Sequence, residues 1–234
     1  MIELINDLKA CSSPQIAEHS QRFFKTGKGE YGEGDKFLGI RAPELREISK
    51  KYAHLNLKKT SELLRSPFHE IRLVSLFILI RHYEKAGQDN KEKIVDLYLA
   101  NINYINNWDL VDASAHKILG DYLLDKKRDL LYELAASEIL WERRIAIMTT
   151  FNFVKNGSYR DTMKLSGILI NDKEDLIHKV VGWMLREVGK KSLDTEISFL
   201  NKHAEQMPRT MLRYAIEKFP EDLRQKYLQK RSSI

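Results

Sequence analysis

The stretch Glu70-Ile71-Arg72-Leu73-Val74 returns 72 residues later as Glu142-Arg143-Arg144-Ile145-Ala146. Both have the order acidic, any residue, Arg, apolar, apolar, which is typical of the first turns of a helix. Halfway between them lies the segment Trp108-Asp109-Leu110-Val111-Asp112. Later segments that resemble these begin at Lys179 and Arg213. The equivalent positions, called the register positions below, are therefore 72, 108, 144, 179 and 213, with steps of 36, 36, 35 and 34 residues. A period of this length is typical of repeats built from two helices.

Two-helix repeats bury their apolar faces against their neighbours, so the period predicts an all-α solenoid. Apolar residues at helical spacing along most of the chain favour about twelve to fourteen helices joined by short loops. Prolines that follow Ser13, Ala42, Ser66 and Met207 are expected to mark helix starts. No stretch has the composition of an interdomain linker, which predicts a single domain over residues 1–234. Chance alignment of degenerate helices is the alternative explanation of the period.

The composition agrees with a helical protein. Of 234 residues only 11 are Gly and 5 are Pro, below the ordinary usage of about 12%, so turns are scarce. The chain has 39 Lys and Arg against 33 Asp and Glu, and this net charge of +6 favours a polyanionic partner without requiring one. We expect a cytoplasmic protein for three reasons. The chain has a single cysteine, no apolar run approaches the roughly 20 residues of a membrane span, and no secretory signal is evident.

A residue four positions after a register position lies on the same face of the same helix. This relation pairs Trp108 with Asp112 and adds Trp183 from a later repeat. We therefore expect one surface of the stacked repeats to carry two indoles, one carboxylate and several cations. For each residue alone, a place in the core or in an ordinary ion pair is the alternative.

Two indoles beside a carboxylate form an electron-rich cleft that favours a cation, at roughly 0.5 to 2 kcal/mol for each ring contact. A sugar whose glycosidic bond is being cleaved passes through such an oxocarbenium-like cation, which a carboxylate stabilises. Cleavage ordinarily needs a second carboxylic acid that protonates the leaving group. A purine alkylated at N3 or N7 already carries a positive charge, so Asp112 alone would suffice for it.

Basic side chains of the later repeats are candidates for contacts to a phosphate backbone. Their alternatives are salt bridges within a repeat and an ordinary solvated helix face. The residues alone do not decide between these interpretations. The candidates are Arg144, Lys179, Arg186, Lys190 and Arg213.

The segment Gly27-Lys28-Gly29-Glu30-Tyr31-Gly32 matches a dinucleotide-binding pattern, but no predicted strand precedes it and its acidic neighbours would repel phosphates. We interpret residues 27–35 as a mobile glycine loop. The histidines have no metal-ligand spacing, and neither Cys11 nor any serine lies in a nucleophile motif. No metal and no organic cofactor is implied.

Four segments in order resemble the HEAT-like-repeat alkylpurine DNA glycosylases of the AlkD type. The similarity covers roughly residues 14–220, and the order and spacing of the segments make it fairly specific. The resemblance implies a right-handed superhelix of HEAT-like two-helix repeats. The protein would be a monomer, and its concave basic face would bind duplex DNA. The segments are Phe37-Leu38-Gly39-Ile40-Arg41-Ala42-Pro43-Glu44-Leu45-Arg46, Asn107-Trp108-Asp109-Leu110-Val111-Asp112, Trp141-Glu142-Arg143-Arg144-Ile145-Ala146 and Gly182-Trp183-Met184-Leu185-Arg186-Glu187.

The resemblance also implies a reaction, namely hydrolysis of the N-glycosidic bond of cationic N3- or N7-alkylpurines in duplex DNA, which leaves an abasic site. In that reaction Trp108 and Trp183 would contact the deoxyribose beside the lesion. Asp112 would stabilise the sugar cation and the hydrolytic water, and Arg144 would grip the backbone. Phe23 stands where the family has an aromatic phenol, a departure that affects duplex contacts and lesion preference. The family is thought to act without a base-flipping pocket.

Two other functions fit the same repeats. A non-catalytic binder of unusual DNA structures would keep the cations and would have no need of Asp112. A protein-interaction scaffold would show no salt-sensitive binding of DNA. For the glycosylase, the resemblance implies a bacterial protein that works on the nucleoid in the cytoplasm.

Overall fold

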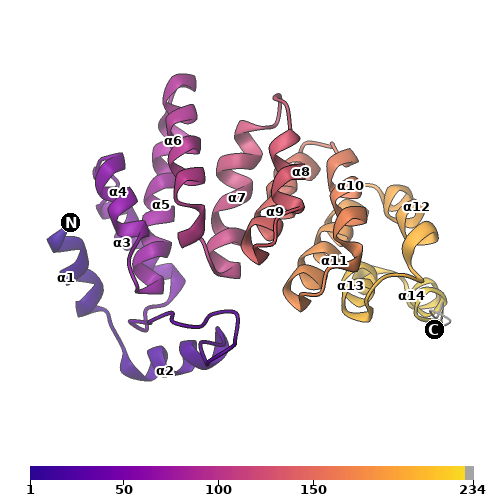
Figure 1. The fold of residues 1–234 in the computed structure, drawn as a ribbon, viewed down its shortest axis with the longest axis horizontal. Coiled ribbons are helices and arrows are strands. Elements are labelled where there is room, and N and C mark those ends of the chain that lie inside the picture. The colour runs from indigo at the N-terminus through magenta and orange to yellow at the C-terminus, as the bar shows by residue number, and fades with distance from the viewer. Residues whose placement is uncertain (230–234) are drawn as a thin grey trace. The chain divides into compact units, whose positions relative to one another are not determined.

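The structure, a computed structural model, describes residues 1–229. Within these residues it contains 14 α-helices, three short 3-10 helices and no strand (Figure 1). The extended pairing found in this part of the chain is an isolated bridge between Lys36 and Phe68. The predicted all-α fold class and the predicted number of helices are confirmed.

The contacts of the chain divide it into two compact units, residues 1–114 and residues 115–234, with the division inside helix α7. The prediction of a single domain stays a prediction. The helices of the first unit are α1 (Ile2–Ala10), α2 (Pro14–Phe23), α3 (Ala42–Lys51), α4 (Leu57–Leu64), α5 (His69–Lys85), α6 (Gln88–Ala100), η1 (Ile102–Tyr104) and the start of α7 (Trp108–Tyr122). The later helices are α8 (Asp129–Ala135), α9 (Leu140–Lys155), α10 (Arg160–Ile168), η2 (Leu169–Asn171), α11 (Asp175–Gly189), α12 (Leu193–His203), α13 (Arg209–Ala215), η3 (Ile216–Lys218) and α14 (Glu221–Gln229).

Helix α5 is the centre of the first unit. Helices α3, α4 and α6 pack around it, so its apolar run from Leu73 to Ile80 is buried on every side. Burial of this apolar surface is the main stabilising term of the unit. Figure 1 shows α2 and the loop after it at the N-terminal end of α5. The start of α5 therefore lies close to α2 and to the loop that follows α2.

Helices α9 and α11 hold the corresponding place in the second unit. Helices α8 and α10 pack against α9, and α12 and α13 pack against α11. The apolar residues of α11 lie on one side, where Val181, Met184 and Leu185 are fully buried. Within residues 1–229, no helix combines the length and the apolar composition needed to cross a membrane.

The five register positions lie on α5, α7, α9, α11 and α13, which is every second α-helix in this stretch. The prediction that they form one exposed row is wrong at two of these helices. Arg72 and Arg144 are 3% and 6% exposed, and Leu76 and Met148 one turn later are buried. The reason is that α5 and α9 are covered by neighbouring helices on several sides, so this face of each meets protein instead of solvent.

Helices α2 and α3 begin at Pro14 and Ala42, as the prolines predict. Pro208 is the N-cap of α13, whereas the prediction for Pro67 is wrong, because Pro67 lies in a bend two residues before α5. The carbonyl oxygen of Pro67 accepts from the Lys36 amide at 3.2 Å, and the Lys36 carbonyl accepts from the His69 amide at 2.8 Å. This bridge joins the end of the glycine loop to the first residue of α5.

Candidate functional site

The first residue of α7 is Trp108, and its side chain is half-buried. The buried Asn107 caps the helix there, because its Oδ1 accepts a hydrogen bond from the Trp108 amide at 2.8 Å. Asp112 follows one turn later and is also half-buried. Residues four apart share a helix face, so the predicted pairing of the indole with this carboxylate is present at the start of α7.

Aromatic rings of α2 and its end surround the Trp108 indole. Phe24 stacks on it with ring centroids 5.4 Å apart and an interplanar angle of 19°. Phe23 meets it edge to face at 6.0 Å and is 56% exposed. Offset-stacked and edge-to-face pairs are the favoured aromatic geometries. The structure thus brings together Trp108 and Phe23, two of the predicted site residues, and adds Phe24.

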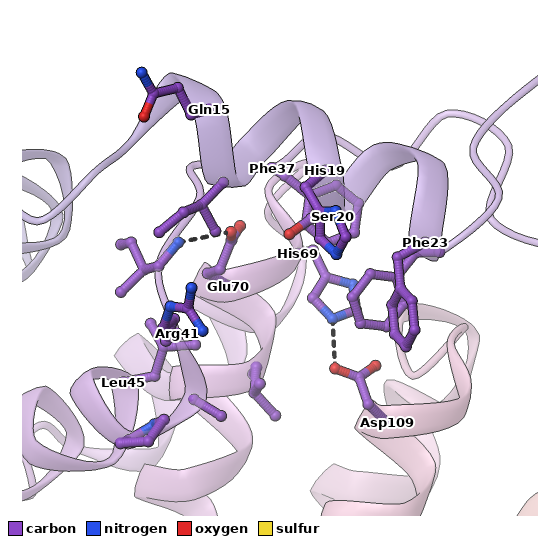
Figure 2. Close-up of a pocket in the computed structure, with 16 residues that line it drawn as sticks. Gln15, His19, Ser20, Phe23, Phe37, Arg41, Leu45, His69, Glu70 and Asp109 are labelled. Carbon is purple, nitrogen blue, oxygen red and sulfur yellow. Dashed lines mark hydrogen bonds and ion pairs between the residues drawn. The ribbon is translucent and has the colours of Figure 1, made fainter.

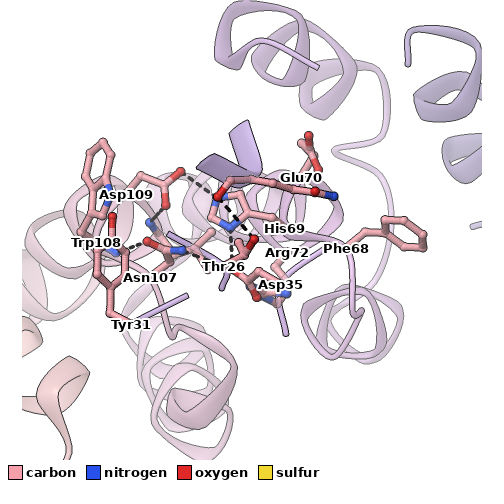
Figure 3. A network of polar contacts seen from close by, with 12 residues as sticks. Thr26, Tyr31, Asp35, Phe68, His69, Glu70, Arg72, Asn107, Trp108 and Asp109 are labelled. Atoms are coloured by element: carbon pink, nitrogen blue, oxygen red, sulfur yellow. Dashed lines mark hydrogen bonds and ion pairs between the residues drawn. The ribbon is translucent and has the colours of Figure 1, made fainter. Parts of the chain in front are cut away.

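A polar network lies behind Trp108, and Figure 3 shows it. The ring of His69 is placed between two carboxylates, with Nδ1 3.1 Å from Asp35 and Nε2 2.8 Å from Asp109. Asp35 also accepts from the guanidinium of Arg72 at 2.7 Å and from the side-chain amide of Asn107 at 3.2 Å. His69 is 2% exposed, so these groups interact in an environment that excludes water.

The charges of the network follow from its burial and its pairing. Burial alone would lower the pKa of His69, but the Asp109 charge and the hydrogen bonds to both carboxylates outweigh it and raise the pKa to about 9. Burial opposes ionisation of Asp35 as well, yet the His69 hydrogen bond and the Arg72 charge hold the pKa of that carboxyl below its usual value. At neutral pH the network therefore contains two cations and their carboxylate partners.

A pocket of about 670 Å³ opens beside the network between α2, α3 and the start of α5 (Figure 2). Phe24 and Phe37 line its apolar part, and His69 with Asp109 lies at its edge. Glu70 also faces it, but its carboxylate already accepts hydrogen bonds from backbone amides of residues 38–40 at 2.8 to 3.3 Å. The pocket is thus largely apolar, and the charges of His69, Asp109 and Glu70 at its edge already have partners.

The electrostatic influence of Asp112 reaches into helix α6. The hydroxyl of Tyr98 is 3.0 Å from the Ser114 hydroxyl and is completely buried. Burial raises the pKa of Tyr98, and the negative charge of Asp112 raises it further. Asp112 is therefore near enough to this buried hydroxyl for its negative charge to oppose the ionisation of Tyr98.

Trp183 lies on α11 in the second unit and is half-buried. Its ring is 4.8 Å from that of Phe151 on α9, at an interplanar angle of 54°. The ammonium of Lys155 lies 4.3 Å from the centroid of the Phe151 ring. Trp183 thus belongs to an aromatic cluster with a cation at its edge, which sequence reasoning did not predict.

Arg144 does not have the exposed guanidinium that a phosphate contact requires. It is buried in α9, and its Nη1 donates to the Leu176 carbonyl at 2.7 Å. The physical reason is again that helices cover this face of α9. Its proposed grip on a DNA backbone stays a prediction, and it would need the side chain to turn outward.

The other predicted phosphate contacts lie on α11, directly after it and on α13, and most of them pair with acids. Lys179 is 2.7 Å from Asp175, and Lys190 is 2.6 Å from Glu187. Arg186 is ion-paired with Glu217. Arg213 is exposed on α13. The ammonium groups of Lys179 and Lys190 are exposed, and such pairs are weak and are screened by salt, so a polyanion could take over these two cations at a small cost. The side chain of Arg186 is largely buried.

Sequence reasoning missed three residues that form the network, namely Asp35, His69 and Asn107, and it missed Phe24, which stacks on Trp108. The signal that could have found part of it is Asn107-Trp108-Asp109, in which polar residues flank the indole on both sides. Asp35 gave no such signal, since it lies 34 residues from His69 in the chain. Within residues 1–229, no group of three or more His, Cys, Asp or Glu side chains is arranged to hold a metal ion.

Comparisons with known proteins agree with the all-α architecture. A search of curated proteins found no match. Among solved structures, the chain is similar to a predicted DNA alkylation repair enzyme from Enterococcus faecalis, with a TM-score of 0.70 and 16% sequence identity over 90% of this chain and 97% of that one. At this identity the likeness shows a shared fold. The family model for DNA alkylation repair enzymes matches residues 4–219. The chain therefore belongs to the DNA alkylation repair enzyme family.

Proposed function

We propose that the protein hydrolyses the N-glycosidic bond of N3- and N7-alkylated purines in duplex DNA, releasing the base and leaving an abasic site. The observation that carries the proposal is the pair on α7, where Trp108 and Asp112 lie one helical turn apart and are both half-buried. The aromatic contacts that Phe23 and Phe24 make with the indole add support. We propose a monomer that works on the bacterial nucleoid in the cytoplasm.

In the proposed reaction the bond between C1′ of the deoxyribose and N9 of the purine breaks, and its electron pair goes to the ring nitrogen. This neutralises the positive charge of the alkylated base, so no acid has to protonate the leaving group. The sugar becomes an oxocarbenium ion, which the Asp112 carboxylate stabilises. Water adds to C1′, and Asp112 takes its proton. The face of the Trp108 indole contributes about 0.5 to 2 kcal/mol toward the cation.

The remaining predicted residues extend this proposal into the second unit. We propose that Trp183 makes the second aromatic contact to the deoxyribose. Phosphate contacts would come from basic side chains of α9, α11, the C-cap of α11 and α13, which would bind DNA through their charge and without sequence preference. These are Arg144, Lys179, Arg186, Lys190 and Arg213.

The test incubates the protein with duplex DNA containing N7-methylguanine and measures free base by mass spectrometry against spontaneous depurination. We expect release that proceeds with time, and binding that weakens steeply between 50 and 200 mM salt because phosphate neutralisation releases counterions. Tight, salt-sensitive binding without release would point to a non-catalytic DNA binder. Absence of both would point to a protein-interaction scaffold.

A further inference from the structure

We propose that His69 is a positioning residue, whose ring fixes the backbone and the indole of Trp108 for the reaction. The inference rests on the proposed function, in which Trp108 contacts the reacting sugar. His69 itself is buried at 2% exposure, so it acts through the residues that it contacts. Two independent paths lead from its ring to Trp108.

The first path runs through the backbone and reaches both neighbours of Trp108. On one side, His69 contacts Asp35, Asp35 accepts from the Asn107 amide group at 3.2 Å, and Asn107 caps the Trp108 amide at 2.8 Å. On the other side, His69 contacts Asp109 at 2.8 Å, whose other oxygen accepts from the Leu110 amide at 2.9 Å. The residues before and after Trp108 are therefore tied to one imidazole ring (Figure 3).

The second path runs through the aromatic rings. The ring of Phe24 lies 4.9 Å from that of His69 and 5.4 Å from that of Trp108. Phe37 stacks on the same His69 ring at 4.7 Å. A cationic ring is attracted to the faces of its aromatic neighbours, so a charged His69 holds Phe24 in the place where it covers the indole.

Both paths need the same charge state of His69. Only the imidazolium donates hydrogen bonds from both ring nitrogens, and each nitrogen here faces a carboxylate. The charged groups around the ring are Asp35 of the glycine loop, Asp109 of α7, and Arg72 and Glu70 of its own helix, with His19 of α2 across the pocket. With a pKa of about 9, the ring is charged at neutral pH and loses one of the two hydrogen bonds above that value.

The test that leaves His69 unchanged is a pH titration of the protein labelled with 5-fluorotryptophan and observed by ¹⁹F NMR. Substitution of Trp108→Phe assigns its signal among those of the three tryptophans. We expect the Trp108 signal to move with a midpoint near the pKa of about 9 while the Trp141 and Trp183 signals stay in place. A Trp108 signal that does not move between pH 7 and 10 in the folded protein would overturn the proposal.

Kinetics test the consequence for the reaction. In single-turnover assays at saturating protein, His69→Gln should lower the rate of base release on the order of 10- to 100-fold, the effect of a misplaced contact group, and leave the half-saturating protein concentration nearly unchanged. His54→Gln is the matched control, because His54 is exposed in the turn that follows α3. A well-folded His69→Gln variant with the wild-type rate would also overturn the proposal. If wild type releases no base, the proposed function fails, and the ¹⁹F titration still decides whether His69 positions Trp108.

Discussion

Replacing Asp112 with asparagine is expected to slow base release from N7-methylguanine duplex by about 10²-fold or more, the usual effect of losing an electrostatic contact to a transition state. Asparagine keeps the size and the hydrogen-bonding capacity of the side chain but removes its negative charge. The oxocarbenium ion would then lose its counter-charge, and the attacking water would lose its proton acceptor. DNA binding should stay the same or become slightly tighter, because the substrate backbone is anionic. The measurement is the single-turnover rate at saturating protein, together with the dissociation constant.

Asp121→Asn provides the control for that experiment. Asp121 lies on the same helix and is exposed. It is nine residues beyond Asp112, which at about 100° per residue places it on the opposite side of α7. Its substitution removes the same charge and should leave the rate unchanged. Equal rates for Asp112→Asn and wild type, with both proteins folded, would exclude Asp112 from the chemistry.

Replacing Gly182 with alanine is expected to destabilise the second unit by about 3 kcal/mol or more, at or above the upper end of the usual overpacking cost. A Cβ atom at Gly182 would lie 2.3 Å from the Met211 carbonyl oxygen and 2.6 Å from the Tyr214 Cβ. These atoms belong to the backbone of α13 or adjoin it, so no side-chain rotation can relieve the clash. Helix α13 would have to move away from α11. Urea unfolding followed by circular dichroism measures the loss.

Gly167→Ala is the matched control, since it adds the same methyl group to another helix of the same unit. A Cβ atom at Gly167 in α10 would meet nothing within 4 Å. Alanine is favoured over glycine inside a helix by about 0.8 to 1 kcal/mol, so this variant should be slightly more stable than wild type. A Gly182→Ala protein as stable as the Gly167→Ala protein would show that α11 and α13 do not pack as closely as described.

The sequence predicted the helical fold because its main signals can be read along the chain without knowing which segments touch. Apolar spacing depends on residues within one or two turns, and the recurrence of Arg72, Trp108 and Arg144 is a fixed period of 36 residues. The pairing of Trp108 with Asp112 could be predicted for the same reason, as residues four apart on a helix must share a face.

Burial and long-range pairing could not be predicted in this way. The outcome for Arg144 depends on which helices cover α9, and the short repeat pattern carries no information about that. One signal was left unused: an apolar run such as that of α5 is typical of a helix buried on all sides, which would have argued against an exposed Arg72. The contact between Asp35 and His69 joins a loop to a helix 34 residues away. No local pattern marks such a contact.

The most direct test of the proposed chemistry compares two duplexes that differ only in the charge of one base. One contains cationic N7-methylguanine and the other contains neutral 8-oxoguanine in the same sequence. With Asp112 as the one carboxylate and no acid to protonate the leaving base, the mechanism predicts release of N7-methylguanine and no release of 8-oxoguanine above the spontaneous rate. Release of both bases at similar rates would contradict it, because a neutral purine leaves readily only when a group of the enzyme protonates it or stabilises the departing anion.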